Sequence, residues 1–269
     1  MKKLIFSAIV ASSLTMTANA SWYITPYGSS SSKTDVKGST DNVKHSAYGI
    51  EAGNENFSFG FKTSSYDFDR STDLNDLKLF YGDVHHTGDI SDDVKYFIGS
   101  SLSFGFKDSL EANKSYDFTP RAGLIFVLDN DWSLLLGGGV ALNKADNTPF
   151  ALAQLIFKDE KTQGLSGKIG FPSTEVNYRF NEIVSVGASA TVFDGGHYYL
   201  KGINGYMQES GYVFGAAVTI NPFDHLELKL GTAYNYDRYL QFYDNNRNKL
   251  GKVKFENDAS VYLQGSAKF

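Results

Sequence analysis

The chain has 269 residues, a formal net charge of −5 and no cysteine. Without cysteine it has no disulfide, no thiolate nucleophile and no zinc site with sulfur ligands. The acidic balance, 30 acidic against 25 basic residues, argues against nucleic acid as a partner.

The first twenty residues have the organisation of a secretory signal peptide. Lys2 and Lys3 form a basic start, residues 4–10 a short apolar run, and Ala18-Asn19-Ala20 a cleavage site. The apolar run is far shorter than the roughly 20 residues of a membrane-spanning helix. We therefore expect export, cleavage after Ala20 and one mature domain over residues 21–269.

Apolar and polar residues alternate along almost the whole mature chain, in segments close to the roughly 9–11 residues that a tilted transmembrane strand needs. Abundant Tyr, Phe and Gly with little Pro suit strands that face lipid on one side and a polar lumen on the other. The pattern predicts about fourteen strands: one that begins at Trp22, then 45–53, one that begins at Phe57, 77–85, 94–107, 119–128, 132–143, 149–157, 164–171, 173–180, 184–193, 211–220, 226–236 and 258–269.

The connections between these strands alternate in length. Short turns rich in Asn, Asp and Pro are expected at one end, at 54–56, 129–131, 181–182 and 221–225. Long polar loops are expected at the other end, at 29–44, 64–76, 108–118, 195–210 and 237–257. The tight junction Phe171-Pro172-Ser173 breaks this order. If it joins one bent strand, the strand count falls and the even parity fails, and a barrel of twelve strands is the alternative number.

The last strand, 258–269, has apolar residues at every second position and ends on Phe269. Such a strand resembles the closing strand of Gram-negative outer-membrane β-barrels, whose assembly machinery reads a C-terminal aromatic signal. The segment 164–179, with Gly170-Phe171-Pro172 and Tyr178-Arg179-Phe180-Asn181, is similar to a stretch in some uncharacterised barrel families without an assigned activity. The resemblance implies an all-β transmembrane barrel in the outer membrane, with Phe269 as interface anchor and assembly signal.

The alternation also predicts which charged residues face the lumen, because Lys or Arg on the lipid face costs about 2–4 kcal/mol at the midplane. Cations exceed anions in this set, which predicts a weak preference for anions, although the same charges could instead pair across strands and fill a narrow lumen. The predicted lumen-lining residues are Glu51, Lys62, Lys78, Lys95, Lys107, Arg121, Lys168, Glu175, Arg179, Glu227, Lys229 and Lys268.

Signs of catalysis are sparse, so an enzyme is not the expected function. His45 and His197 are the only histidines expected near the outer surface, where one of them could serve a hydrolase with Asp194 or a loop serine. No phosphate-binding glycine loop or dinucleotide fingerprint is present, and we expect no cofactor and no metal.

The pattern as a whole favours a passive pore for small hydrophilic solutes, with outer-membrane lipid, lipopolysaccharide and the barrel-assembly machinery as partners. A closed structural or adhesive barrel with partner-binding outer loops is the first alternative, and an outer-membrane hydrolase is the second. A barrel of this size lies between filled eight-stranded barrels and open channels of sixteen or more strands.

Overall fold

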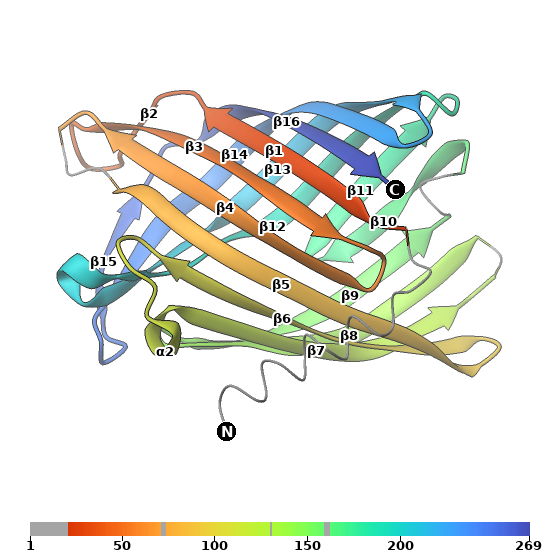
Figure 1. Ribbon diagram of the computed structural model, residues 1–269, viewed down its shortest axis with the longest axis horizontal. Helices are drawn as coiled ribbons and strands as arrows, with labels where there is room; N and C mark the ends of the chain where they lie inside the picture. Colours follow the sequence, from red (N-terminus) through yellow and green to blue (C-terminus); the bar gives the residue numbers. More distant parts are fainter. Residues whose placement is uncertain (1–20, 71–73, 130, 159–161) are drawn as a thin grey trace.

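The computed structural model describes residues 21–70, 74–129, 131–158 and 162–269, so the predicted signal peptide lies outside the described residues. The described chain folds into a closed antiparallel barrel of 14 strands (Figure 1). The barrel strands are β1 (Tyr23–Ser31), β3 (Asn42–Gly53), β4 (Phe57–Phe68), β5 (Leu74–Ser91), β6 (Val94–Phe106), β7 (Tyr116–Val127), β8 (Trp132–Asn143), β9 (Asn147–Phe157), β10 (Gly164–Phe171), β11 (Ser173–Arg179), β12 (Val184–Leu200), β13 (Gly205–Phe223), β14 (Leu226–Tyr243) and β16 (Asp258–Lys268).

The ring closes between its first and last strands, since β1 pairs with β3 on one edge and with β16 on the other. Beyond the last paired strand residues, the backbones of Trp22 and Phe269 exchange two hydrogen bonds of 2.9 Å. Both ends of the described chain therefore lie at the same end of the barrel. The predicted strand number and its even parity are confirmed.

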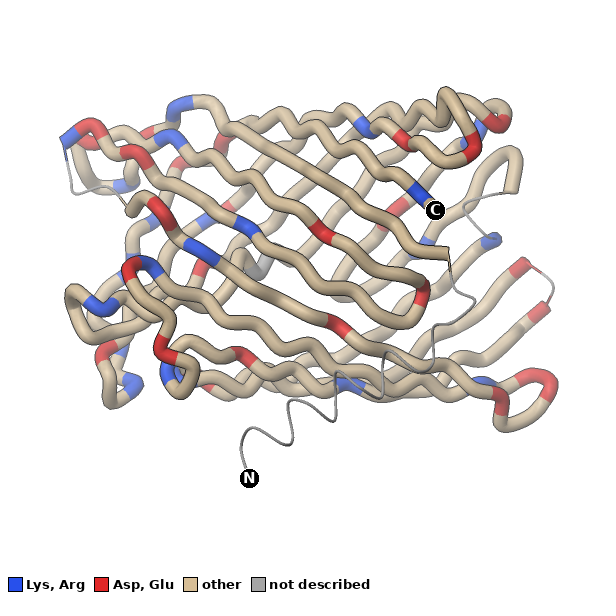
Figure 2. The backbone as a smooth tube through the Cα atoms, in the orientation of Figure 1, with Lys and Arg blue, Asp and Glu red and all other residues tan. Residues whose placement is uncertain are grey.

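The two ends of the barrel differ in their connections. The end that holds Trp22 and Phe269 carries turns such as Asp92-Asp93 and 224–225, and it corresponds to the periplasmic end of outer-membrane barrels. The opposite, outer end carries the short strands β2 (Thr34–Asp35) and β15 (Lys249–Lys254) and the short helix α2 (Ala112–Ser115), grouped on the left in Figure 1. Charged residues crowd into the connections at both ends (Figure 2).

The junction that put the strand count in doubt is a turn. β10 and β11 pair with each other from Gly164 opposite Arg179 to Lys168 opposite Glu175, and a cis peptide joins Phe171 to Pro172 between them. Two separate strands at this place keep the parity even. The inner connection before β10 includes residues 159–161, which lie outside the described residues.

The outside of the ring carries exposed apolar side chains on strands all the way around it. A belt of this extent is far larger than the apolar patches of water-soluble proteins, and it matches the lipid-facing band of a membrane barrel. Its members are 37% to 63% exposed and include Ile50, Phe59, Phe80, Ile98, Leu124, Leu136, Ile169, Val186, Val218, Leu230 and Val261.

Aromatic side chains border this belt at both ends. Tyr178, Phe180, Phe223 and Phe269 are exposed toward the periplasmic end, and Tyr234 and Tyr236 toward the outer end. Amphipathic rings favour the boundary between lipid and water, so these positions suit the two interfaces of a bilayer. Among the described residues, no helix is long and apolar enough to cross a bilayer.

The prediction of outer loops at 195–210 and 237–257 is wrong, because much of both segments forms paired strands. Strands β12, β13 and β14 run for 17, 19 and 18 residues, well beyond the roughly 9–11 that cross a bilayer, so they continue past the wall as paired hairpins. The continuation of β14 pairs with β15 at the outer rim. The continuation of β12 instead pairs with β6.

Candidate functional site

The hairpin formed by residues 195–210, here named the mouth hairpin, folds across the outer mouth of the barrel. It comprises the last part of β12, the short helix η1 (Lys201–Ile203) and the first part of β13. Its tip pairs in parallel with β6, at Tyr198 opposite Gly105 and Tyr199 opposite Phe106. Five strands, β7 to β11, separate β6 from β12 in the ring, so this pairing joins nearly opposite walls.

Local backbone features explain why the hairpin turns inward. The pairing of β12 with β13 shifts between Asp194 and Gly196, and Gly196 has φ +115°, a conformation that glycine adopts without strain. At the far wall, a Cβ on Gly105 would lie 1.9 Å from the carbonyl oxygen of His197. Only a glycine in β6 therefore allows the two backbones to approach this closely.

The tip of the mouth hairpin is held by a small number of polar contacts. The backbone amide of Lys107 donates to the carbonyl oxygen of Tyr199 at 3.1 Å. The ammonium of Lys114, in α2, donates to the Tyr199 hydroxyl at 2.9 Å and lies 3.1 Å from the carboxylate of Glu111. The helix between β6 and β7 thus anchors the hairpin at the outer rim.

Apolar side chains fill the space beneath the hairpin. We name this cluster the mouth core; its members come from six strands and from the segment after β15, and each is at most 5% exposed. These side chains form one buried cluster at the outer end of the lumen, beneath the mouth hairpin. The residues are Val43, Tyr66, Leu77, Tyr198, Leu200, Met207, Leu240 and Phe255.

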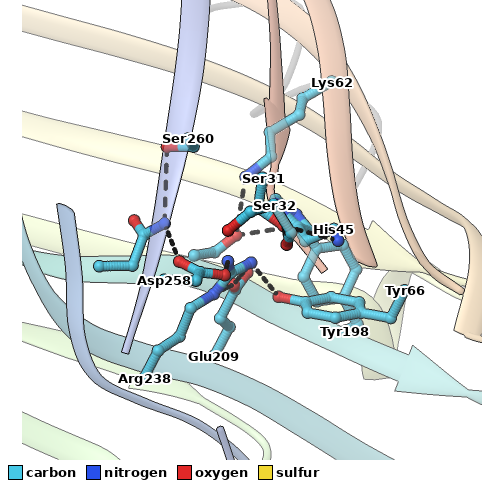
Figure 3. Close-up of polar contacts among 12 residues, drawn as sticks. Ser31, Ser32, His45, Lys62, Tyr66, Tyr198, Glu209, Arg238, Asp258 and Ser260 are labelled. Atoms are coloured by element: carbon cyan, nitrogen blue, oxygen red, sulfur yellow. Dashed lines mark hydrogen bonds and ion pairs between the residues drawn. The ribbon is translucent and has the colours of Figure 1, made fainter. Parts of the chain in front are cut away.

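A buried ion pair lies against the mouth core (Figure 3). The guanidinium of Arg238 donates from Nε to Oε1 of Glu209 at 2.8 Å and from Nη2 to the hydroxyl of Tyr66 at 2.9 Å. The side chain of Glu209 is 0% exposed and that of Arg238 is 6% exposed. Since Glu209 belongs to the mouth hairpin and Arg238 to the wall strand β14, the pair ties one to the other.

Three further polar contacts lie around this pair. The Lys62 ammonium donates to the carbonyl oxygen of Gly195 at 3.2 Å, at the base of the hairpin. On the other side, Nη1 of Arg238 lies 4.0 Å from the carboxylate of Asp258, which also accepts a hydrogen bond from Asn235. The charges of Lys62 and Arg238 are therefore matched by those of Glu209 and Asp258.

Toward the periplasmic end, charged residues line the inner wall and pair across strands. Nη2 of Arg121 lies 2.7 Å from both carboxylate oxygens of Asp83, two strands away. Glu175 lies 3.9 Å from the ammonium groups of both Lys168 and Lys229. These side chains are 23% to 41% exposed, so water reaches this part of the lumen.

Other predicted lumen residues lie nearer the periplasmic rim or bond to tyrosine. Lys268 lies 3.8 Å from Glu227, and Arg179 donates to the carbonyl oxygen of Glu182 at 3.5 Å. Lys95 lies 3.3 Å from the exposed carboxylate of Asp89. Glu51 accepts hydrogen bonds from the hydroxyls of Tyr23 at 2.8 Å and Tyr81 at 3.0 Å.

Lys78 is the exception, and the expectation that it faces the lumen is wrong. Leu77 belongs to the mouth core and Leu79 packs against it, so both point inward. Lys78 between them shares the outer face of Phe80, which is 45% exposed. The prediction assumed that apolar side chains face lipid. In this part of β5 the apolar side chains face the mouth core inside the barrel instead.

The two histidines considered for a hydrolase do not lie at the outer surface. His45 points into the barrel and its ring centroid lies 4.7 Å from that of Tyr66, while His197 is 1% exposed and stacks on Tyr206 at 5.1 Å. The side chain of Asp194 lies outside what the structure describes. Both imidazoles serve as packing groups of the closed mouth.

No protein-family model and no curated protein matches the chain. Among solved structures, an outer membrane channel from Pseudomonas putida F1 is similar over 94% of this chain and 97% of its own, at 10% identity and TM-score 0.47. The NanC porin covers 91% and 100% at 11% identity and TM-score 0.42. The KdgM porin in complex with disordered oligogalacturonate covers 91% and 99% at 8% identity and TM-score 0.38.

The chain has the fold of an outer-membrane β-barrel. This conclusion rests on its own closed ring of strands and its apolar belt, because similarities at such low identities and scores carry no argument about function. What the barrel does has to be inferred from its lumen.

A cavity of about 380 Å³ lies inside the barrel next to the mouth core. Its walls come from β1, β12, β13, β14 and β16, with His45 and Arg238 at the border of the mouth core. A second, smaller recess shares Ser189, Gly215 and Tyr262 with it and reaches Glu175 and Lys229. The two recesses therefore follow one strip of the inner wall from the charged lumen to the mouth.

Sequence reasoning missed the residues that close the mouth. Tyr198, Met207 and Glu209 fall in a stretch assigned to a loop, and Arg238 in another. A signal was present, since Tyr198-Tyr199-Leu200 and Tyr206-Met207 are more apolar than an exposed loop requires.

Proposed function

We propose that this protein is an outer-membrane channel for small hydrophilic solutes, and that the mouth hairpin controls its outer opening. The observation that carries the proposal is a charged, water-accessible lumen that ends at a hairpin joined to the far wall by two paired residues. The wall strands, in contrast, pair with their neighbours over most of their length. Such an element can leave the mouth without breaking the ring.

The proposed ion preference of the open lumen is weak and toward anions. Along β10 to β16, Lys168, Arg179, Lys229 and Lys268 outnumber Glu175 and Glu227, and these side chains include the exposed ones that ions would meet. Along β3 to β7, Arg121 is balanced by Asp83 and Lys95 by Asp89, while Lys62 and Glu51 add one charge of each sign. The residual cationic field is small because most of the predicted lumen cations have an acidic partner.

A closed barrel whose outer elements bind a partner is the second candidate. The mouth core favours it, because burying eight large side chains stabilises the closed conformation. In that case the hairpin would stay docked, and the loops above it would form the binding surface. We propose no catalytic role for either form.

The proposed setting is the outer membrane, with lipid and lipopolysaccharide around the apolar belt. Phe269 is 72% exposed, and its backbone completes the seam with Trp22, so the ring is free for recognition. We propose it as the signal that the barrel-assembly machinery reads.

Planar-bilayer recordings of the refolded mature chain test the channel, with a variant in which residues 196–208 are replaced by an Asn-Gly turn. The expected result is rare openings for the wild type and steady openings for the variant. A matched variant that shortens the β14–β15 turn at 244–248 should open as rarely as the wild type. Silence of a correctly folded hairpin-less barrel would favour the closed, partner-binding form.

A further inference from the structure

The cavity beside the mouth has an aromatic lining on its wall. A Cβ on Gly231 would lie 2.2 Å from Cζ of Tyr262, and one on Gly49 would lie 2.6 Å from Cζ of Tyr27. The hydroxyl end of each tyrosine ring therefore lies over a glycine of the neighbouring strand, and both tyrosines line the cavity.

Short polar side chains surround these rings. Hydroxyls come from Ser29, Ser189, Thr191 and Ser260, and amides from Asn235 and Gln264. Hydroxyl and amide groups both donate and accept hydrogen bonds, which suits a ligand whose own groups do the same. Val213 of β13, Ala233 of β14 and Leu263 of β16 are the aliphatic residues among those that line the cavity.

The charge at the site is matched within the protein. Arg238 at the border of the cavity is paired with Glu209 at 2.6 Å and lies 4.0 Å from Asp258. A charged ligand would have to compete with these pairs. The adjoining recess is lined by Lys229 and Glu175, whose charges lie 3.9 Å apart.

The size of the cavity sets the size of the ligand. A cavity of roughly 150 Å³ is enough to hold one benzene ring, and this one measures about 380 Å³. The cavity therefore has room for about two six-membered rings. It offers tyrosine rings and neutral hydrogen-bonding groups. Saccharides suit such a site, because their rings have an apolar face and a rim of hydroxyls.

We infer that the cavity beside the mouth binds a neutral saccharide of one or two rings, stacked on Tyr262 and hydrogen-bonded by the surrounding hydroxyls and amides. The inference rests on the proposed channel function, because it names the class of solute that would pass along the lumen to the mouth. The saccharide enters through the water-accessible periplasmic half, so the docked hairpin does not prevent binding in detergent solution.

Calorimetric titration of the refolded mature barrel with maltose tests this site without any need for conduction. The expected result is saturable binding of one maltose, lost in Thr191→Phe, whose side chain would fill the cavity. Val192→Phe is the matched control, because Val192 is the next residue, lies on the lipid face and is 39% exposed. Tyr262→Leu should raise the Kd roughly 2- to 10-fold, as loss of an aromatic contact does, and Tyr234→Leu on the lipid face should leave it unchanged.

Lactobionate, an anionic disaccharide of the same size, completes the test. Weaker binding of lactobionate than of maltose supports a neutral site, and tighter binding overturns it. The inference also fails if maltose gives no saturable heat with a barrel of native heat-shifted mobility, or if Thr191→Phe binds as the wild type does. A barrel that binds maltose but stays silent without its hairpin would overturn the channel and leave the site standing.

Discussion

The buried pair between Glu209 and Arg238 should decide how often the mouth opens. Glu209→Gln keeps the size of the side chain but removes its charge, so the guanidinium in the closed state loses its partner at 2.6 Å. When the hairpin leaves, Arg238 gains water instead. The substitution therefore destabilises the closed state and has little effect on the open one.

The magnitude follows from the burial of the pair. Removing one partner of a buried ion pair costs about 3–5 kcal/mol. The low end of that range, about 3 kcal/mol, applies at this site, because Tyr66 still accepts a hydrogen bond at 2.9 Å and Asp258 remains 4.0 Å away. With tenfold per 1.4 kcal/mol, the ratio of open to closed barrels rises roughly 100-fold.

Single-channel recording measures this ratio as open probability. Glu256→Gln is the matched control, because Glu256 pairs with Lys37 at 3.7 Å at the outer rim with a side chain 55% exposed. An exposed pair of that kind is worth about 0–1 kcal/mol, so its loss should leave openings near the wild-type level.

A double variant separates lost charge from lost packing. Glu209→Leu with Arg238→Met replaces the pair by apolar groups of similar volume, a change that is often neutral or stabilising. We expect this barrel to open as rarely as the wild type. If the double variant opens as readily as Glu209→Gln, or if Glu209→Gln stays silent, the ion pair does not hold the hairpin.

Three other predictions follow from the same structure. Leu240→Ala creates a cavity in the mouth core and should weaken hairpin docking by about 2–5 kcal/mol. Hydrogen exchange of amides 196–209 should become faster, while that of the β3 and β4 amides stays unchanged. Equal exchange in both regions would count against a separable hairpin. Replacing Lys168, Arg179 and Lys229 by Glu in the hairpin-less barrel should move the reversal potential in a salt gradient from weakly anion-selective to cation-selective, and an unchanged potential would remove these residues from the ion path. Phe269→Ala should slow assembly into outer membranes in cells but leave refolding into detergent intact, and slowed refolding in detergent would make the ring a stability element instead.

The alternation of side chains was sufficient to predict the membrane-spanning part of the fold. Each membrane-spanning strand separates lipid from water, so its side chains alternate between apolar and polar. For this reason apolar residues such as Ile98 and Val261 point outward and are exposed. The same condition placed Lys229 and Glu175 on the inner wall, where they lie 3.9 Å apart. Pairing between them could not be read locally, since they come from strands three places apart in the ring.

The mouth escaped prediction because it obeys a different rule. Leu77 and Leu79 face an apolar core inside the barrel, so the assumption that apolar means lipid-facing turned Lys78 the wrong way. The contact between the mouth hairpin and β6 joins segments about ninety residues apart, and no local pattern encodes it. That contact explains why glycine occurs at position 105 and aromatic residues occur at 198–199.

The seam between β1 and β16 sets the order of events in folding. The side chains of Thr25 and Ser266, hydrogen-bonded at 2.9 Å, are 241 residues apart in the chain. One edge of β1 therefore stays unpaired until the last strand arrives, however early the neighbouring hairpins form, and loop closure over such a span is slow. During that interval the chain has two open edges and an apolar belt, the combination most prone to aggregate. Anything that shields the two edges and the apolar belt until β16 pairs with β1 therefore favours the native barrel over aggregates.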